Sequence, residues 1–141
     1  MSGCKEVTID FVVVKGDPDM EAIEDDIRAD LAKIGITANV RFANETEYDS
    51  AEKDGDYNLL FGRTWGAPYD PHSYLSSFAV PSHFEYQASR NLEPPMTQEA
   101  LIDKIIGVQS LTDQRALSDK WKEILQDIHD QAVFYPLWGS R

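Results

Sequence analysis

The chain has 141 residues, of which 42% are hydrophobic and 27% charged, as expected for one globular domain rather than a disordered segment. Its net charge of −12 argues against nucleic acid or an anionic membrane surface as a partner, because both require clustered Lys and Arg, and the thirteen basic residues are scattered. No apolar run is long enough to span a membrane, the N-terminus lacks the apolar core of a signal peptide, and the single cysteine, Cys4, cannot form an internal disulfide.

The first third of the chain predicts a strand–helix–strand unit. Residues 7–14 are apolar and β-branched, as in a buried strand. Asp17 is suited to cap a helix that starts with Pro18, and Gly35 is suited to end it. Residues 36–42 predict a second strand, parallel to the first. The helix carries one apolar stripe, formed by Ile23, Ile27, Leu31 and Ile34.

The next elements are a short helix and a short strand. Asn44 and Glu47 have the spacing of a capping box, which predicts a helix near residues 45–52. Gly55 and Asp56 then turn the chain into a third apolar strand at residues 57–61.

Two amphipathic helices and a last strand close the chain. Thr97 and Thr112 are each suited to cap one of the helices. Residues 133–138 predict a strand, which its proline restricts to a sheet edge or a strand end. We therefore predict an α/β fold over residues 1–141, a single domain with a mixed sheet flanked by helices. A long irregular loop at residues 62–87 would project from one end of this domain.

The irregular segment is the most informative part of the sequence. Its aromatic residues, histidines and prolines are too interspersed for a regular helix or strand. Irregular backbone held by a rigid scaffold is where binding residues tend to lie. Eight of the fifteen aromatic residues fall in or beside it, a concentration too local to be expected from general core filling: Tyr57, Phe61, Trp65, Tyr69, Tyr74, Phe78, Phe84 and Tyr86.

Three residues of this segment are candidate contacts for a small ligand. Trp65 and Tyr69 each offer an apolar face with one polar group, which suits the wall of a cleft. Packing against the core is an equally good interpretation of both. Arg63 is able to hold a carboxylate with two hydrogen bonds, although an exposed ion pair is the commoner role of a lone arginine.

The histidines are weaker candidates from their spacing alone. His72 and His83 lie eleven positions apart, near Asp70 and Glu85, and match no compact metal-binding motif. The run Asp70-Pro71-His72 favours a turn in which the Asp70 side chain accepts hydrogen bonds from backbone N–H groups. Enzyme motifs are absent from the sequence, so catalysis is the poorer interpretation. A hydrolase that uses His72 and Asp70 is the weakest alternative.

A family resemblance strengthens the interpretation of His83 as a metal ligand. The run from Asn58 to Ser73, with Ser76-Ser77 and Val80-Pro-Ser-His83, closely resembles the nickel-binding proteins of ABC importers. These proteins belong to the peptide/nickel family of extracytoplasmic solute-binding proteins. The similarity extends over nearly the whole chain, and the string that reaches His83 is more specific to the nickel branch than Trp-Gly-x-x-Tyr-Asp-Pro alone.

The resemblance implies a non-catalytic, periplasmic receptor that delivers its ligand to a membrane permease. In the nickel branch the metal arrives bound to a small organic polycarboxylate chelator. By motif position, the resemblance implies that His83 is the direct protein ligand of Ni(II) and that Trp65 and Tyr69 form the aromatic wall. Arg63 stays a candidate ligand contact, and His72 has no such support.

The chain departs from the family in its length. Family members are several times longer and close two lobes around the ligand by a hinge. This chain resembles only part of one lobe, on the C-terminal side, so it would supply half of a site. Two alternatives stay open: a related module that binds a peptide or another organic solute without metal, and an interaction domain that forms a homodimer through the exposed cleft face.

Overall fold

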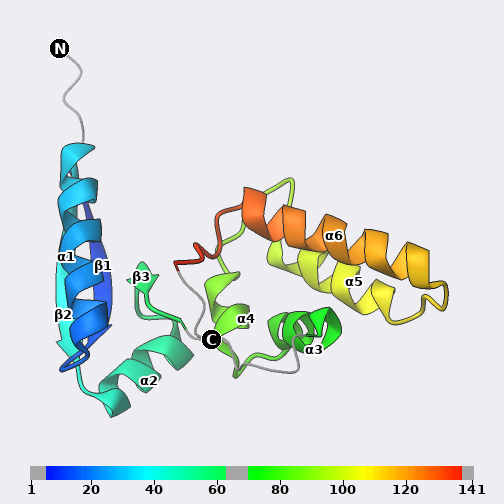
Figure 1. The fold of residues 1–141 in the computed structure, drawn as a ribbon, viewed down its shortest axis with the longest axis horizontal. Helices are drawn as coiled ribbons and strands as arrows, with labels where there is room; N and C mark the ends of the chain where they lie inside the picture. Colours follow the sequence, from blue (N-terminus) through cyan, green and yellow to red (C-terminus); the bar gives the residue numbers. More distant parts are fainter. Residues whose placement is uncertain (1–5, 63–69, 138–141) are drawn as a thin grey trace. The chain divides into compact units, whose positions relative to one another are not determined.

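The computed structural model describes residues 6–62 and 70–137, and the chain forms two compact units, residues 1–65 and 66–141 (Figure 1). The elements of the first unit are β1 (Val7–Val14), α1 (Pro18–Lys33), β2 (Ile36–Ala43), α2 (Glu45–Asp54) and β3 (Leu59–Leu60). The elements of the second unit are α3 (Pro71–Leu75), the 3₁₀ helix η1 (Ser76–Ala79), α4 (Phe84–Ala88), α5 (Gln98–Val108) and α6 (Gln114–Asp130). Within the described ranges, no helix is both long and apolar enough to cross a bilayer.

The first unit is built on a parallel sheet in the order β2-β1-β3. β1 and β2 pair in register over all eight residues of each strand, which confirms the predicted strand–helix–strand unit. β3 is shorter than the predicted strand at residues 57–61. The side-chain oxygen of Asn58 accepts a hydrogen bond from the Asp10 N–H at 2.8 Å and so replaces a backbone carbonyl in the ladder. The strands described here are all parallel, and the predicted mixture of directions is not seen among them.

One helix covers each face of this sheet. Alternate residues of β1 point to opposite faces. Phe11 and Val13 are buried on the side of α1, where Met20 packs against them. Val12 is buried on the other side, against Ala51 of α2. The apolar run of β1 is therefore the centre of two small cores, and its position in the middle of the sheet follows from that burial.

The helix ends of this unit follow the local sequence. The Asp17 side chain accepts a hydrogen bond from the Met20 N–H at 3.1 Å, and Pro18 is the first helical residue of α1. Gly35 follows α1 with φ of 81°, a backbone conformation that favours glycine. Asn44 and Glu47 form both bonds of the capping box, at 3.0 and 2.9 Å. These caps confirm the sequence predictions.

The second unit is helical and has its own core. α5 and α6 lie side by side (Figure 1), and residues of both helices, with Leu75 and Phe78, form one buried cluster. Three short helices, α3, η1 and α4, occupy half of the predicted irregular loop at residues 62–87, so that prediction was wrong for residues 71–79 and 84–87. The buried residues of the cluster are Leu75, Phe78, Leu101, Ile105, Val108, Trp121, Ile124 and Ile128.

Two further predictions in this unit need correction. The cap of α6 is Asp113, whose side chain accepts from the Ala116 N–H at 2.8 Å, and not Thr112. Thr97 does cap α5, as predicted. Residues 133–137 are not a strand, because the Phe134 ring turns onto the helical core and meets Phe78 edge-on at 5.8 Å.

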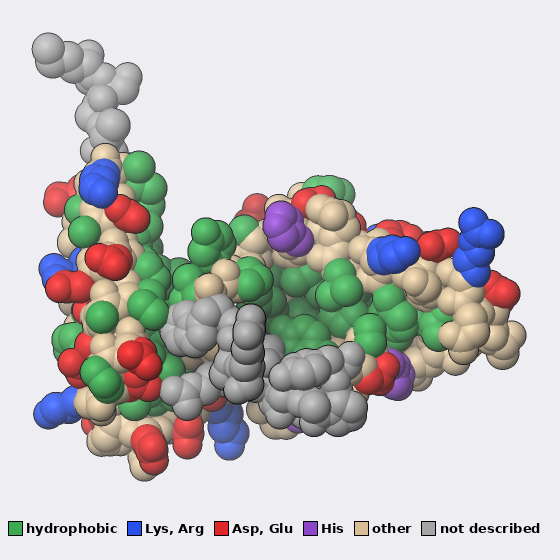
Figure 2. Space-filling model, viewed as in Figure 1, with side chains coloured by type: hydrophobic (Ala, Val, Ile, Leu, Met, Phe, Trp, Pro, Cys, Tyr) green, Lys and Arg blue, Asp and Glu red, His purple; other side chains and the backbone are tan. Residues whose placement is uncertain are grey.

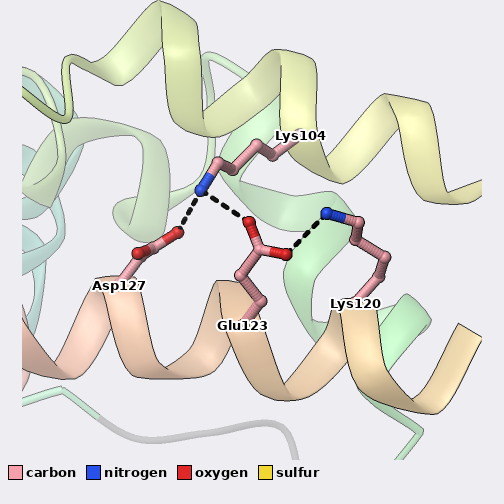
Figure 3. A network of polar contacts seen from close by, with 4 residues as sticks. All are labelled: Lys104, Lys120, Glu123 and Asp127. Carbon is pink, nitrogen blue, oxygen red and sulfur yellow. Dashed lines mark hydrogen bonds and ion pairs between the residues drawn. The ribbon is translucent and has the colours of Figure 1, made fainter. Parts of the chain in front are cut away.

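An ion-pair network joins α5 to α6 (Figure 3). Lys104 Nζ lies 2.6 Å from a carboxylate oxygen of Asp127 and 3.0 Å from one of Glu123. Lys120 Nζ bonds the other oxygen of Glu123 at 2.6 Å. The bond to Asp127, and then the bond to Glu123, raises the pKa of Lys104. Bonds from Lys120 and Lys104 lower the pKa of Glu123.

We expect Lys104→Met to lower the denaturation midpoint at neutral pH. The substitution removes the ion pairs of Lys104 with Glu123 and Asp127, which join α5 to α6, and keeps an aliphatic side chain. Glu123 has a lowered pKa in the folded chain, so its contribution to stability is present at neutral pH and is lost as the pH falls through that pKa. The difference between variant and wild type should therefore shrink in acid, and in about 1 M salt. Lys122→Met is the control, since Lys122 lies 4.0 Å from Asp119 within α6 alone. An equal effect of both variants would contradict this role.

Adjacent residues of α6 give a matched test of the helical core. Ile124 is 1% exposed and Leu125 is 44% exposed. Ile124→Ala should reduce the free energy of unfolding by about 2–5 kcal/mol, because it removes buried methyl groups and leaves a cavity. Leu125→Ala should change it by less than about 0.5 kcal/mol. Urea denaturation followed by circular dichroism measures both, and equal losses would place the core on a different face of α6.

Candidate functional site

The candidate site begins where β3 ends. Phe61 is buried in the first unit, with its ring centroid 5.3 Å from that of Phe11, and Gly62 follows it. The next seven residues, 63–69, lie outside the described residues. They include three of the predicted ligand contacts, so the roles of Arg63, Trp65 and Tyr69 stay predictions.

Asp70 and His72 have structural roles in the second unit. The Asp70 carboxylate accepts a hydrogen bond from the Ser73 N–H at 3.0 Å and caps α3. The predicted bond to the backbone is confirmed, although it starts a short helix rather than a simple turn. His72 is exposed on α3, and its ring centroid lies 6.0 Å from that of Trp121 on α6. Packing against Trp121 therefore accounts for the position of His72.

His83 lies immediately before α4, on a turn that backbone contacts hold in place. Its N–H donates to the Val80 carbonyl at 2.9 Å, and the Gln87 side chain donates to the Pro81 carbonyl at 2.9 Å. His83 is half-buried, and its imidazole does not cap α4. The imidazole is neither donor nor acceptor in these two bonds.

Most aromatic residues around the segment pack into the cores, contrary to the sequence prediction. Phe61 and Phe78 are buried, and Tyr57 and Tyr74 pack against core residues. Phe84 meets Phe134 edge-on at 5.3 Å. The concentration of rings in the sequence thus arises largely because residues 57–61 and 74–84 each supply rings to a core.

A carboxylate two positions after His83 is buried, and the sequence analysis did not predict its burial. Glu85 is 2% exposed, on α4. Burial of the Tyr74 hydroxyl, with a smaller effect of the Glu85 charge, raises the pKa of Tyr74 to about 12. No local pattern predicts this pair, because a Glu in a short amphipathic stretch is usually exposed.

Polar contacts also connect α4 to the helix that follows. Ser89, at the end of α4, is fully buried, and its hydroxyl donates to the Tyr86 carbonyl at 3.0 Å. Gln98, at the start of α5, donates to that same carbonyl at 2.6 Å and to the Ser89 hydroxyl at 3.0 Å. α4 is therefore attached to α5 through polar contacts as well as through the apolar cluster.

The Tyr74 hydroxyl gives a test by absorbance at alkaline pH. The unfolded chain releases this proton near pH 10 and the folded chain near 12, so a rise in pH between these values favours unfolding. At about pH 11, folded Tyr74→Phe should show the same tyrosinate absorbance as wild type, because Tyr74 is still protonated there. A loss of one tyrosinate signal in the variant would contradict the assignment. Glu85→Gln should lower the pKa of Tyr74 only in part, since burial is the larger cause.

Within residues 6–62 and 70–137, no three His, Cys, Asp or Glu side chains lie close enough together to hold a metal ion. Of the four site residues predicted from the sequence, His83, the predicted metal ligand, lies within the described residues. It lies in the second unit with His72, and the two have different surroundings.

Comparison with known proteins identifies the family. Residues 3–86 match the family described as bacterial extracellular solute-binding proteins, family 5, middle region. The chain belongs to this family. Over 112 residues it is 39% identical to the nickel-binding periplasmic protein of Escherichia coli (strain K12), a match that covers 79% of this chain and 21% of that protein. It is 29% identical over 116 residues to the probable di/tripeptide-binding protein 5 of Pseudomonas aeruginosa (strain UCBPP-PA14), over 79% of this chain and 20% of that protein.

Solved structures of solute-binding proteins share the fold. The structure of NikA from Brucella suis in complex with Fe(III)-EDTA superposes with a TM-score of 0.80 at 34% identity, over 90% of this chain and 25% of that one. DppA from Helicobacter pylori, in complex with the peptide STSA, has a TM-score of 0.71 at 20% identity, over 93% of this chain and 25% of that one. The predicted α/β fold of the periplasmic-binding-protein type is confirmed. The chain spans about a fifth of the length of the curated relatives it matches.

Proposed function

We propose that residues 1–141 form one domain, part of a lobe of the extracytoplasmic solute receptor of an ABC importer, and supply half of a site for a nickel–polycarboxylate complex. The observation that carries this proposal is the 39% identity to a nickel-binding periplasmic protein. The family match, which ends at residue 86, includes His83. The role proposed for the chain is binding and release of a solute, without catalysis.

His83 is the proposed metal ligand. An imidazole binds Ni(II) in its neutral form, which is well populated near neutral pH. One imidazole by itself holds a metal weakly, so the remaining coordination positions would be filled by the carboxylates of the chelator. Two hydrogen bonds support the role, from the His83 N–H to the Val80 carbonyl and from the Gln87 side chain to the Pro81 carbonyl, because neither of them uses the imidazole.

The residues between β3 and α3 are the proposed contacts to the organic part of the ligand. Trp65 and Tyr69 would pack against the chelator, and the Tyr69 hydroxyl and Arg63 would bind its carboxylates. A site built from one lobe buries a small ligand poorly, so affinity of the 141-residue chain should be low. A facing lobe and a membrane permease are the partners proposed for the complete receptor, in the periplasm.

Calorimetry tests the role of His83. Ni(II) alone and Ni(II) with citrate are titrated into wild type, His83→Ala and His129→Ala. His129 is the control, because it is exposed on α6 and its ring lies 3.5 Å from Asp130. We expect heats of binding for wild type and His129→Ala in the presence of citrate, and a loss of most of that heat for His83→Ala.

The same titration separates the alternatives. Equal heats for wild type and His83→Ala would contradict direct ligation. If Trp65→Ala abolished binding of an organic solute that His83→Ala still bound, a metal-free module would replace the proposal. A stable dimer in light scattering, with no heat from either ligand, would favour an interaction domain.

A further inference from the structure

The outer edge of β2 is the clearest feature of the first unit that the proposed function does not use. β2 is the first strand in the order β2-β1-β3, and among residues 6–62 no strand pairs with its other side. The Ala43 carbonyl accepts from the Lys15 N–H at 2.8 Å, so Ala43 directs its polar groups toward β1. Because the direction alternates along a strand, Ala38, Val40 and Phe42 direct N–H and C=O away from β1.

This edge lacks the features that usually protect an outer strand. Edge strands are commonly short, interrupted by a proline or a bulge, or lined with lysines. β2 pairs without interruption over eight residues and contains neither Pro nor Lys. Its one charged residue, Arg41, is bound to the side chain and the carbonyl of Asp56, at 3.1 and 2.6 Å. Phe42 is 49% exposed beside it.

A groove of about 450 Å³ runs along the same side of β2. Its floor comes from β2 and is formed by the apolar residues Ala38, Val40 and Phe42, whose backbone polar groups point outward, together with the polar residue Asn39. Its wall is polar and comes from α1. The residues of that wall are Glu21, Glu24, Asp25 and Arg28.

The wall of this groove carries a net negative charge. Arg28 bonds Glu24 at 2.9 Å and also pairs with Asp25, whereas the third carboxylate, Glu21, accepts a hydrogen bond from the Gly16 N–H at 2.9 Å, so three carboxylates stand against one guanidinium. The surroundings have the same sign, since residues 6–62 contain fifteen Asp and Glu against five Lys and Arg. Acidic side chains follow the length of α1 in Figure 2. An occupant of the groove should therefore be basic.

We propose that the edge of β2 is a docking site for an extended strand of a separate polypeptide that carries Lys or Arg at alternate positions. Its backbone would pair with the outward N–H and C=O groups of Ala38, Val40 and Phe42, as in strand addition to a sheet edge. Every second side chain would face α1, where a cation meets Glu21 and Asp25. A second copy of this chain fits poorly, because it would place one acidic wall beside another. The inference does not depend on the metal site.

The proposal predicts a selective response in the amide spectrum of the ¹⁵N-labelled chain. The probes are two synthetic peptides, acetyl-(Val-Lys)₄-amide and acetyl-(Val-Glu)₄-amide. The Lys peptide should shift the amide signals of Ala38, Val40 and Phe42 and slow their hydrogen exchange, and the Glu peptide should not. Equal shifts with both peptides, or shifts confined to other parts of the chain, would overturn it.

Variants separate backbone pairing from charge. Ala38→Pro removes an outward N–H that β1 does not use and should abolish the shifts, whereas Ala38→Val keeps that N–H and should preserve them. Glu21→Gln with Asp25→Asn should weaken binding of the Lys peptide roughly tenfold, and this test stands even if Ala38→Pro fails to fold. Unchanged binding in the charge variant would overturn the proposal. So would a concentration-dependent self-association that Ala38→Pro abolishes, because a second copy would then be the occupant.

Discussion

Burial of the Phe78 ring is the constraint on which the position of His83 depends. Phe78 is fully buried and meets Tyr74 and Phe134 edge-on, at centroid distances of 6.1 and 5.8 Å. Phe134 also meets Phe84 at 5.3 Å. In the sequence, His83 lies between Phe78 and Phe84, whose rings both pack against Phe134. Edge-on ring pairs have a preferred geometry as well as a hydrophobic contribution, so the cluster sets the path of the chain on both sides of the imidazole.

Local sequence signals were sufficient for much of the fold. The caps at Asp17, Asn44 and Thr97, and the apolar β-branched run of β1, act within a few residues and were predicted correctly. The strand predicted at residues 133–138 does not form at residues 133–137, because β-branched and aromatic residues favour a strand unless their side chains pack into a core elsewhere. The Phe134 side chain packs against the core of the second unit. The short helices within residues 71–88 were missed for a related reason, since helices of four or five residues depend on tertiary packing rather than on their own propensity.

The candidate site was predicted mainly from the family resemblance and little from the residues alone. Spacing gave no reason to prefer His83 over His72, and the structure distinguishes their surroundings: His72 packs near Trp121, whereas His83 lies on the turn before α4. The burial of Glu85 was missed, because burial of a carboxylate is set by the whole core and leaves no local pattern. The concentration of aromatic residues in one segment did not distinguish ligand contacts from core residues, since hydrophobic cores contain the same residue types.

The account depends most on direct coordination of the metal by the imidazole of His83. X-ray absorption at the nickel K-edge, measured on the chain with Ni(II) and citrate, tests this without relying on affinity. We expect the outer-shell scattering of one imidazole in wild type and in His129→Ala, and its absence in His83→Ala. A spectrum without imidazole scattering in wild type, or one that His83→Ala leaves unchanged, would contradict the account.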